Sequence, residues 1–267
     1  TGLAGVSREG NLPVSPLPGG ARRAMVVLYT DFGSDDPYVG QMKAALLQHG
    51  QSTLPIVDLL HRVPDFDVRA GAHLLAALAT SFDSGTVFLA VVDPGVGSDR
   101  PAVVIEADGR WYVGPDNGLL GVVAARARVL RTWCIVWRPP GLSASFHGRD
   151  LFAPIAARIA TGNPLTTELV ECAGLEHTQA ADDLAAVIYV DHYGNALTGL
   201  RAATVARQAW LAVGTARVPP ARVFAEVPVG QPFWYENSVG LVEIAVNRGS
   251  AASELCLAVG SQVAPEA

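Results

Sequence analysis

The feature that most constrains the fold is an unbroken apolar run, TVFLAVV, at residues 86–92. A strand that is apolar on both of its sides is typical of a parallel sheet whose two faces are covered by helices. A similar run, MVVLYT, lies at 25–30, and the segment LPIVDLL at 54–60 is also strand-like. These three segments predict strands of one sheet.

Helical patterns separate the predicted strands. Pro37, preceded by Asp35 or Asp36 as a cap, predicts the start of a helix after the first strand. Asp65 is a candidate cap for a second helix after the segment at 54–60. Strands that alternate with helices indicate an α/β architecture with a mostly parallel sheet.

The character of the chain changes after this region. Residues 163–185 are polar and irregular, and short strand-like segments with turn signals follow them. The sequence therefore predicts an α/β N-terminal domain with a mostly parallel sheet and a smaller all-β C-terminal domain, sandwich-like or barrel-like. We place an N-terminal tail at 1–24, the α/β domain at 25–165, a linker at 166–185 and the β-rich domain at 186–267.

Charge and hydropathy exclude several classes of function. The net charge is −6 and no Lys/Arg-rich run occurs, so the chain lacks the basic surface that binds nucleic-acid phosphates. No apolar run reaches the roughly 18–20 residues that cross a bilayer, and the N-terminus does not read as a secretory signal. We therefore expect neither a nucleic-acid partner nor a membrane.

Cysteine and histidine usage predicts a metal-free protein. The three cysteines, Cys134, Cys172 and Cys256, are scattered and have no CxxC spacing. We therefore expect no disulfide framework, no zinc site and a reducing cytoplasm as the location. The six histidines show no HxH or HExxH spacing, so we expect no other metal site.

Two aspartates, Asp31 and Asp93, lie just past the ends of predicted strands, each followed by a glycine-containing turn, DFGSDD or DPGVGSDR. In open α/β sheets, ligands bind beyond the carboxyl ends of the strands. A carboxylate there can accept two hydrogen bonds from the neighbouring hydroxyls of a ribose. The alternative is that each aspartate only caps a turn or a helix.

Further candidates lie in polar segments later in the chain. His147, in FHGRD before a predicted helix, is of the residue type that most often transfers protons near neutral pH. The alternative is that Asp150 caps the helix and His147 is an ordinary loop residue. DHYGN at 191–195 and the segment at 232–252 place aromatics beside amides, which suits a purine. Ordinary turns and core aromatics are the simpler explanation of these two segments alone.

Six motifs occur in a fixed order: TDFGSDDPYVGQMKA, VVDPGVGSDRPAV, GPDNGLL, FHGRDLFAP, DHYGNALT and NSVGLVEIAVN. Together they resemble the family of S-adenosylmethionine hydroxide adenosyltransferases, adenosine-forming hydrolases related to the fluorinases and chlorinases. The resemblance covers roughly residues 25–262. It implies an α/β N-terminal domain, a β-rich C-terminal domain and a homotrimer with active sites between subunits.

The resemblance also implies roles for individual residues. The hydrolytic Asp, Arg and His of the family correspond to Asp93, Arg100 and His147, and its ribose-holding aspartate corresponds to Asp31. On this hypothesis Arg100 and His147 hold the water, Asp93 orients Arg100, and either Asp93 or His147 takes the proton. The other implied substrate contacts are Asp35 at the methionine ammonium, Phe66 and Phe146 against the substrate, Asp191 and Ser238 at methionine, and Tyr193, Asn195 and Asn247 in the adenine pocket.

The same comparison bears on the chemistry. The fluorinase has tyrosine at the positions of Asp93 and His147 and a halide-binding serine at Gly148, a glycine that chlorinases share. The halogenases also carry arginines at the positions of Val239 and Val246, so their methionine-carboxylate contacts are not carried over. An anionic Asp93 would repel a halide.

We therefore expect hydrolysis of S-adenosyl-L-methionine by attack of water or hydroxide at ribose C5′. The products are adenosine and L-methionine, and no cofactor is required. The alternatives are a chlorinase-like halogenase and a non-catalytic module that binds S-adenosylmethionine or adenosine.

Overall fold

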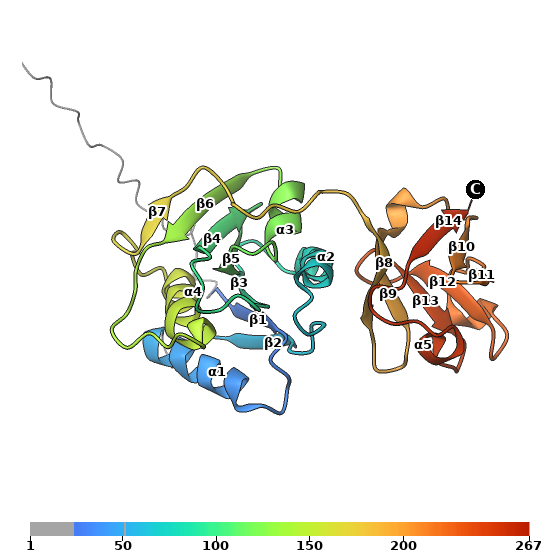
Figure 1. Cartoon of the computed structure of the whole chain (residues 1–267), viewed down its shortest axis with the longest axis horizontal. Helices are drawn as coiled ribbons and strands as arrows, with labels where there is room; N and C mark the ends of the chain where they lie inside the picture. The colour runs from blue at the N-terminus through green and yellow to red at the C-terminus, as the bar shows by residue number, and fades with distance from the viewer. Residues whose placement is uncertain (1–23, 51, 267) are drawn as a thin grey trace, which may run out of the picture.

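The computed structural model describes residues 24–50 and 52–266. Its larger sheet has seven strands in the order β2-β1-β3-β5-β4-β6-β7 (Figure 1). β1 runs parallel to β2 and β3, and β3 runs parallel to β5, which confirms the mostly parallel sheet. The strands are β1 (Val26–Thr30), β2 (Ile56–Leu60), β3 (Val87–Val91), β4 (Ala102–Ala107), β5 (Arg110–Pro115), β6 (Leu130–Ile135) and β7 (Leu169–Glu171).

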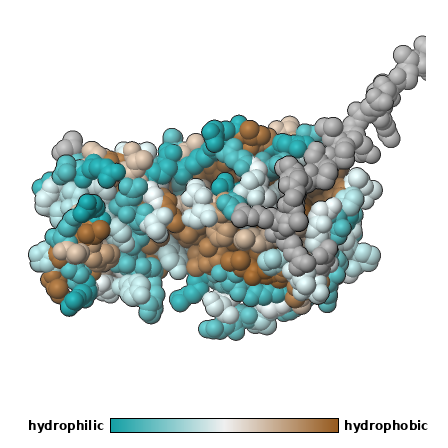
Figure 2. All heavy atoms as spheres, turned by 180° about the vertical axis from the view of Figure 1, so that it is seen from behind, coloured by the Kyte–Doolittle hydropathy of each residue, from teal (hydrophilic) through white to brown (hydrophobic). Residues whose placement is uncertain are grey.

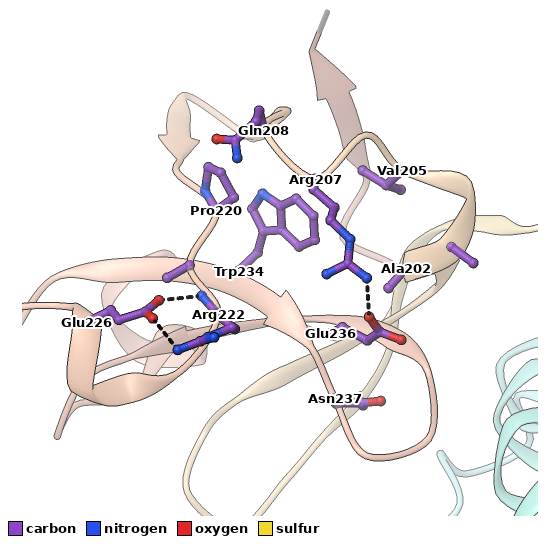
Figure 3. A pocket seen from close by; sticks show the side chains of 12 residues that line it. Ala202, Val205, Arg207, Gln208, Pro220, Arg222, Glu226, Trp234, Glu236 and Asn237 are labelled. Carbon is purple, nitrogen blue, oxygen red and sulfur yellow. Dashed lines mark hydrogen bonds and ion pairs between the residues drawn. The ribbon is translucent and has the colours of Figure 1, made fainter.

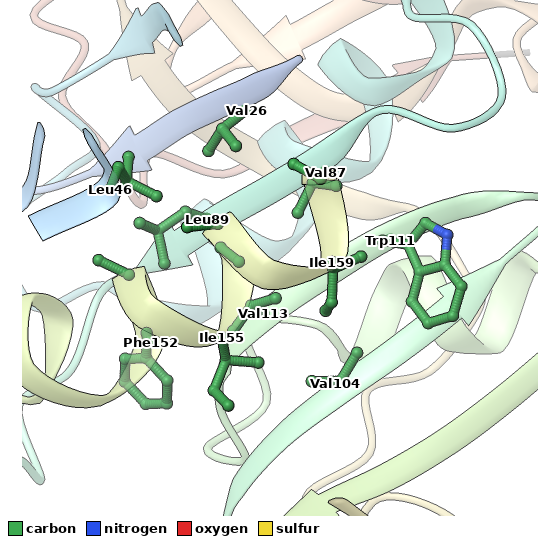
Figure 4. Close-up of a cluster of buried hydrophobic side chains, with 14 of the residues drawn as sticks. Val26, Leu46, Val87, Leu89, Val104, Trp111, Val113, Phe152, Ile155 and Ile159 are labelled. Carbon is green, nitrogen blue, oxygen red and sulfur yellow. The ribbon is translucent and has the colours of Figure 1, made fainter. Parts of the chain in front are cut away.

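Helices cover both faces of this sheet. α1 (Pro37–His49) and α4 (Ala153–Thr161) lie on one face, and α2 (Val68–Leu78) and α3 (Gly121–Arg126) lie on the other (Figure 1). Each face of the sheet has its own cluster of buried side chains, the first beneath α1 and α4 and the second beneath α2 and α3. The side chains of β3 alternate between them: Leu89 packs in the first cluster, which Figure 4 shows, and Phe88 packs in the second. This double burial is the physical reason for the unbroken apolar run.

The start of α2 differs from the expectation. Its cap is Asp67 rather than Asp65, because the Asp67 Oδ1 accepts a hydrogen bond of 2.9 Å from the amide of Ala70. α1 begins as expected at Pro37, with Asp36 in the cap position. The acidic residues near a helix start were recognisable from the sequence, but only the backbone path decides which of them reaches the free amides.

The strands of the C-terminal part pair antiparallel in two sheets, as expected of an all-β region. Its four-stranded sheet has the order β12-β13-β9-β8, and its three-stranded sheet has the order β11-β10-β14. The strands are β8 (Leu184–Val190), β9 (Ala196–Arg201), β10 (Trp210–Val213), β11 (Ala216–Val218), β12 (Pro232–Glu236), β13 (Leu241–Val246) and β14 (Val263–Glu266). The short helical turns are η1 (Ala79–Ser81), η2 (Gly148–Phe152), η3 (Ala202–Thr204), η4 (Phe224–Glu226) and α5 (Ala251–Glu254).

The predicted tail and linker can be compared with the elements of the structure. β7 lies inside the segment expected to be a linker and extends the edge of the larger sheet. The expected tail lies outside the described residues except for Ala24, which is buried in the first core cluster. The division into domains itself stays a prediction. None of the helices in the described residues combines the length and the apolar character that a membrane crossing requires.

The cysteines differ from the expectation. Cys134 in β6 and Cys172 just after β7 form a disulfide, with 5.9 Å between their Cα atoms. The two residues are 38 positions apart, and only the antiparallel pairing of β6 with β7 brings them together. The expectation of no disulfide was therefore wrong, because it rested on sequence spacing and not on strand pairing.

Breaking this disulfide is expected to destabilise the fold. Closing a loop of this length restricts the unfolded chain, which predicts a loss of about 2–4 kcal/mol in the free energy of unfolding for Cys134→Ser. Urea unfolding of the oxidised protein measures it. Cys256→Ser, at the exposed free cysteine, is the matched control and is expected to change stability by less than about 0.5 kcal/mol. Equal midpoints for the two variants would contradict the prediction.

Candidate active site

Two adjoining cavities open where β1 and β3 end. Asp31 follows β1 directly and Asp93 follows β3 by two residues, and the parallel register pairs Thr30 with Val91. The cavities have volumes of about 420 and 790 Å³, and both are lined by Phe32, Tyr38 and Asp93. The strand order therefore brings the two aspartates to one edge of the sheet, as expected.

Asp93, Arg100 and His147 form one cluster at these cavities. The guanidinium of Arg100 donates to both carboxylate oxygens of Asp93, with 2.7 Å from Nε to Oδ1 and a shorter contact from Nη2 to Oδ2. The Arg100 Nη2 also lies 3.1 Å from the Nδ1 of His147. The structure thus joins three residues that lie 7 and 47 positions apart in the sequence.

The cluster is largely buried. The side chains of Arg100 and Asp93 are 7% and 4% exposed. Arg100 also donates from Nη1 to the carbonyl of Pro101 at 3.1 Å and stacks over the ring of Phe152. Asp93 and His147 line the smaller cavity, whereas Arg100 is absent from its lining and lies behind them. Arg100 therefore organises the other two side chains.

Hydrogen bonding determines which nitrogen of His147 carries the proton. A guanidinium only donates hydrogen bonds, so the Nδ1 that faces Arg100 must accept, and the proton of the neutral ring is on Nε2. Burial, and then the positive charge of Arg100, lower the pKa of His147 below that of an ordinary histidine. The ring is therefore neutral near pH 7 and offers an N–H donor at Nε2.

A single π-helical turn, η2, positions His147. His147 is its cap residue, and the amide of Asp150 donates to the carbonyl of Phe146 at 3.2 Å. Gly148 is buried there, and a Cβ on it would lie 3.1 Å from the sulfur of Met42 and 3.3 Å from the ring of Phe146. The close approach of α1 therefore favours glycine at this position, since a larger residue would push the Met42 and Phe146 side chains aside by a few tenths of an ångström.

Asp31 and Phe66 form the second half of the site. The Asp31 Oδ2 accepts a hydrogen bond of 3.2 Å from the amide of Phe66. Burial raises the pKa of Asp31. The ring of Phe66 is 73% exposed, and its residue has a φ of 61°. Asp36 lines the cavity that contains Asp31, whereas Asp35 is exposed and does not.

Three aromatic rings line the smaller cavity. Phe32, Tyr38 and Phe146 pack edge to face, with ring centroids 5.5 to 6.0 Å apart. Only Phe146 was expected from the sequence. Phe32 and Tyr38 belong to the first motif, and their place directly after Asp31 and Pro37 was a signal that could have identified them.

The C-terminal candidates do not line either cavity. The Asp191 carboxylate accepts from the amides of Tyr193 and Asn195 and from the Asn195 side chain, so it closes its own turn. The Asn247 side chain donates to the carbonyl of Val227 at 2.6 Å. Tyr193 is 75% exposed, and Ser238 is also exposed. Within one chain these five residues therefore remain apart from Asp93.

A separate hollow of about 890 Å³ lies in the C-terminal part (Figure 3). Its charged side chains pair with each other, Arg207 with Glu236 at 3.7 Å and Arg222 with Glu226 at 3.3 Å. The indole of Trp234 forms a wall and donates to the carbonyl of Ala209. Trp234 and Asn237 of the segment at 232–252 line the hollow, but none of the candidate site residues does. Within the described residues there is also no group of three or more His, Cys, Asp or Glu side chains that could hold a metal ion.

Comparison with known proteins gives the following similarities. Residues 26–168 match the N-terminal domain and residues 185–264 the C-terminal domain of the SAM hydroxide adenosyltransferase family. The (R)-S-adenosyl-L-methionine hydrolase of Thermus thermophilus is 40% identical over 89% of this chain and 98% of its own. A fluorinase of Actinopolyspora mzabensis is 26% identical over 90% of this chain and 96% of its own. The crystal structure of an uncharacterized conserved protein from Thermotoga maritima has a TM-score of 0.81 and 32% identity, and the match covers 90% of this chain and 98% of that one.

Proposed function

The chain belongs to the SAM hydroxide adenosyltransferase family, and we propose from this that it is an S-adenosyl-L-methionine hydrolase that forms adenosine and L-methionine. The observation that carries the proposal is the Asp93, Arg100 and His147 cluster at the cavity beside Asp31. A module that only binds the substrate has no need of this buried, hydrogen-bonded set.

The reaction is a substitution at the ribose C5′. The water oxygen forms a bond to C5′ with a lone pair, the C5′–S bond breaks, and its electron pair goes to sulfur. The sulfonium leaves as the neutral thioether of methionine, so no covalent enzyme intermediate is needed. The enzyme contributes by holding one water in line with the C5′–S bond in a site with little other solvent.

The protonation state of His147 determines which side chain donates to the attacking water and which accepts its proton. In the tautomer set by Arg100, His147 donates from Nε2 to the water oxygen, and the water donates to Asp93. The water becomes strongly acidic as its oxygen bonds to C5′, so a carboxylate of low basicity suffices to take the proton. Arg100 acts through the other two, because it holds both carboxylate oxygens of Asp93 and the Nδ1 of His147.

Substrate binding is assigned to the rest of the site. Asp31 accepts hydrogen bonds from the ribose hydroxyls beside Phe66 and Phe146, and no cofactor or metal takes part. Asp36 lines the cavity and is therefore a second candidate, besides Asp35, for the methionine ammonium.

A homotrimer with sites between subunits would complete this pocket. The residues assigned to methionine and adenine do not line the cavities of their own chain, so a neighbouring chain would supply them. They are Asp191, Tyr193, Asn195, Ser238 and Asn247. Figure 2 shows apolar surface over the larger domain, and Phe66 and Tyr193 are largely exposed, which supports such contacts. Light scattering that gives the mass of a single 27.9 kDa chain would contradict this assembly.

The proposal keeps the cytoplasmic location expected from the sequence. A reducing cytoplasm would hold the Cys134–Cys172 pair mostly as thiols. Thiol alkylation in intact cells tests this, since modification of Cys256 alone would contradict a reducing compartment.

The decisive experiment is turnover in ¹⁸O-water, with and without chloride, followed by mass spectrometry. We expect adenosine that carries ¹⁸O at its 5′-oxygen, together with methionine, in both conditions. The reason is that the anionic Asp93 lines the cavity and disfavours a halide there. A 5′-halo product that forms only with chloride would identify a halogenase instead. No turnover in either condition would identify a binding module.

A further inference from the structure

A buried histidine to which the proposed reaction gives no role, His61, contacts the turn that carries Asp31 and lies at the wall of the cavity that contains Asp31. His61 is 7% exposed and lies just past the end of β2. Its Nδ1 is 2.8 Å from the hydroxyl of Thr30, and its Nε2 is 3.0 Å from the carboxylate of Asp58. The carboxylate of Asp58 also accepts from the ammonium of Lys43, at 2.5 Å.

The direction of each hydrogen bond in this chain follows from its partners. Burial opposes ionisation of Asp58, but Lys43 and His61 outweigh it and lower the pKa of the carboxyl. An ionised carboxylate only accepts, so in the neutral ring the Nε2 of His61 carries the proton and its Nδ1 accepts from the hydroxyl of Thr30. The Thr30 oxygen in turn accepts from the amide of Phe32, at 3.3 Å. The chain therefore runs in one direction, from Phe32 to Thr30 and on to His61.

The backbone of His61 holds the same turn from its other side. Its carbonyl accepts a hydrogen bond of 2.7 Å from the amide of Gly33. His61 therefore contacts Thr30 through its ring and Gly33 through its carbonyl, on the two sides of Asp31. Thr30 is fully buried, so its hydroxyl is not a nucleophile despite the Asp–His–Thr arrangement.

We propose that His61 is a positioning residue for Asp31, which fixes the Thr30–Gly33 turn so that the carboxylate meets the ribose hydroxyls. The proposal rests on the ribose-binding role of Asp31 in the proposed function. The carboxylate of Asp31 is held by backbone amides, that of Phe66 at 3.2 Å and its own, so its orientation depends on the turn that carries it. A turn that is already rigid loses less conformational entropy when the substrate binds, and binding is tighter as a result.

Calorimetry with adenosine and steady-state kinetics with S-adenosylmethionine test this role. Loss of one buried hydrogen bond predicts that His61→Ala weakens adenosine binding and raises KM by about tenfold, with kcat changed less than about twofold. His61→Asn is the conservative variant, because its amide oxygen lies near the place of Nδ1 and again accepts from Thr30. We expect it to recover most of the affinity.

Two further variants separate positioning from general stability. Thr30→Val removes the hydroxyl at nearly constant volume and is expected to reproduce the His61→Ala effect. Adding it to His61→Ala should change binding little further, because both remove the hydrogen bond between Thr30 and His61 and the double variant loses in addition only the longer 3.3 Å bond from the Phe32 amide. His49→Ala, at an exposed histidine on α1, is the control and is expected to bind like the unaltered protein.

The outcomes distinguish this inference from the proposed function. Unaltered adenosine affinity and KM in His61→Ala would overturn the positioning role while leaving the hydrolase intact. If kcat falls by the same factor by which KM rises, and His61→Asn recovers neither, the positioning role would also be overturned and His61 would be a purely structural residue. An unaltered protein that neither binds adenosine nor turns over the substrate would overturn both. If His61→Ala does not fold, His61→Asn and Thr30→Val carry the test.

Discussion

Replacing Asp93 by alanine is expected to lower kcat/KM by a factor of about 10³–10⁴, since both a proton acceptor and an electrostatic partner are lost. The variant leaves Arg100 as a buried cation without its carboxylate, while Asp93 itself is only 4% exposed in the native fold. Such an unpaired charge predicts a loss of about 3–5 kcal/mol in the free energy of unfolding. Steady-state kinetics and urea unfolding on the same preparation measure the two effects.

Asp99→Ala is the matched control for this prediction. Asp99 is an exposed carboxylate in the same loop, so its removal changes the net charge equally but leaves the buried pair in place. We expect near-native kcat/KM and a change in stability within about 0.5 kcal/mol. Similar activities for Asp93→Ala and Asp99→Ala would remove Asp93 from the mechanism.

The second large effect is expected at His147. His147→Ala removes the Nε2–H donor to the water and predicts a fall in kcat of about 10²–10³. His147→Gln places an amide N–H near the position of Nε2 and is expected to recover part of that loss. Single-turnover rates of the two variants measure the difference. Equal rates for alanine and glutamine would show that the donor at Nε2 does not contribute.

The pH profile gives an independent test of His147. Protonation would place an N–H on Nδ1 against the donating guanidinium of Arg100, so the neutral ring is the active form. Because burial and Arg100 lower the pKa of His147, the neutral form persists to lower pH than in an ordinary histidine. The loss of activity at low pH should therefore begin below the pH at which an ordinary histidine titrates. This acid limb of the pH profile should be absent in His147→Gln. An acid limb that persists in His147→Gln would belong to another group.

Several features of the fold and the site followed from local patterns. The apolar run of β3 predicted a strand buried on both faces, because adjacent side chains of a strand point to opposite sides and all of them are apolar here. Asp31 and Asp93 were predicted at one edge of the sheet, because the carboxyl ends of parallel strands lie together. These conclusions depend on residues close together in the sequence and on general rules of chain geometry.

Other features depended on how distant segments pack. The disulfide requires the pairing of β6 with β7 over 38 positions, and the protonated nitrogen of His147 depends on which of its two nitrogens faces Arg100. The choice of Asp67 as the cap of α2 likewise follows from the path of the backbone.

The order and type of the motifs in the amino-acid sequence were thus sufficient to identify the family and to predict the sheet and the cluster of Asp93, Arg100 and His147. The tertiary structure alone decided that Arg100 lies behind Asp93 and His147, that Phe32 and Tyr38 complete the cavity wall, and that His61 contacts Thr30 and Gly33 on the two sides of Asp31. The physical reason is that hydrogen-bond direction, burial and cavity shape are properties of side chains brought together by folding, and no local pattern of residues contains them.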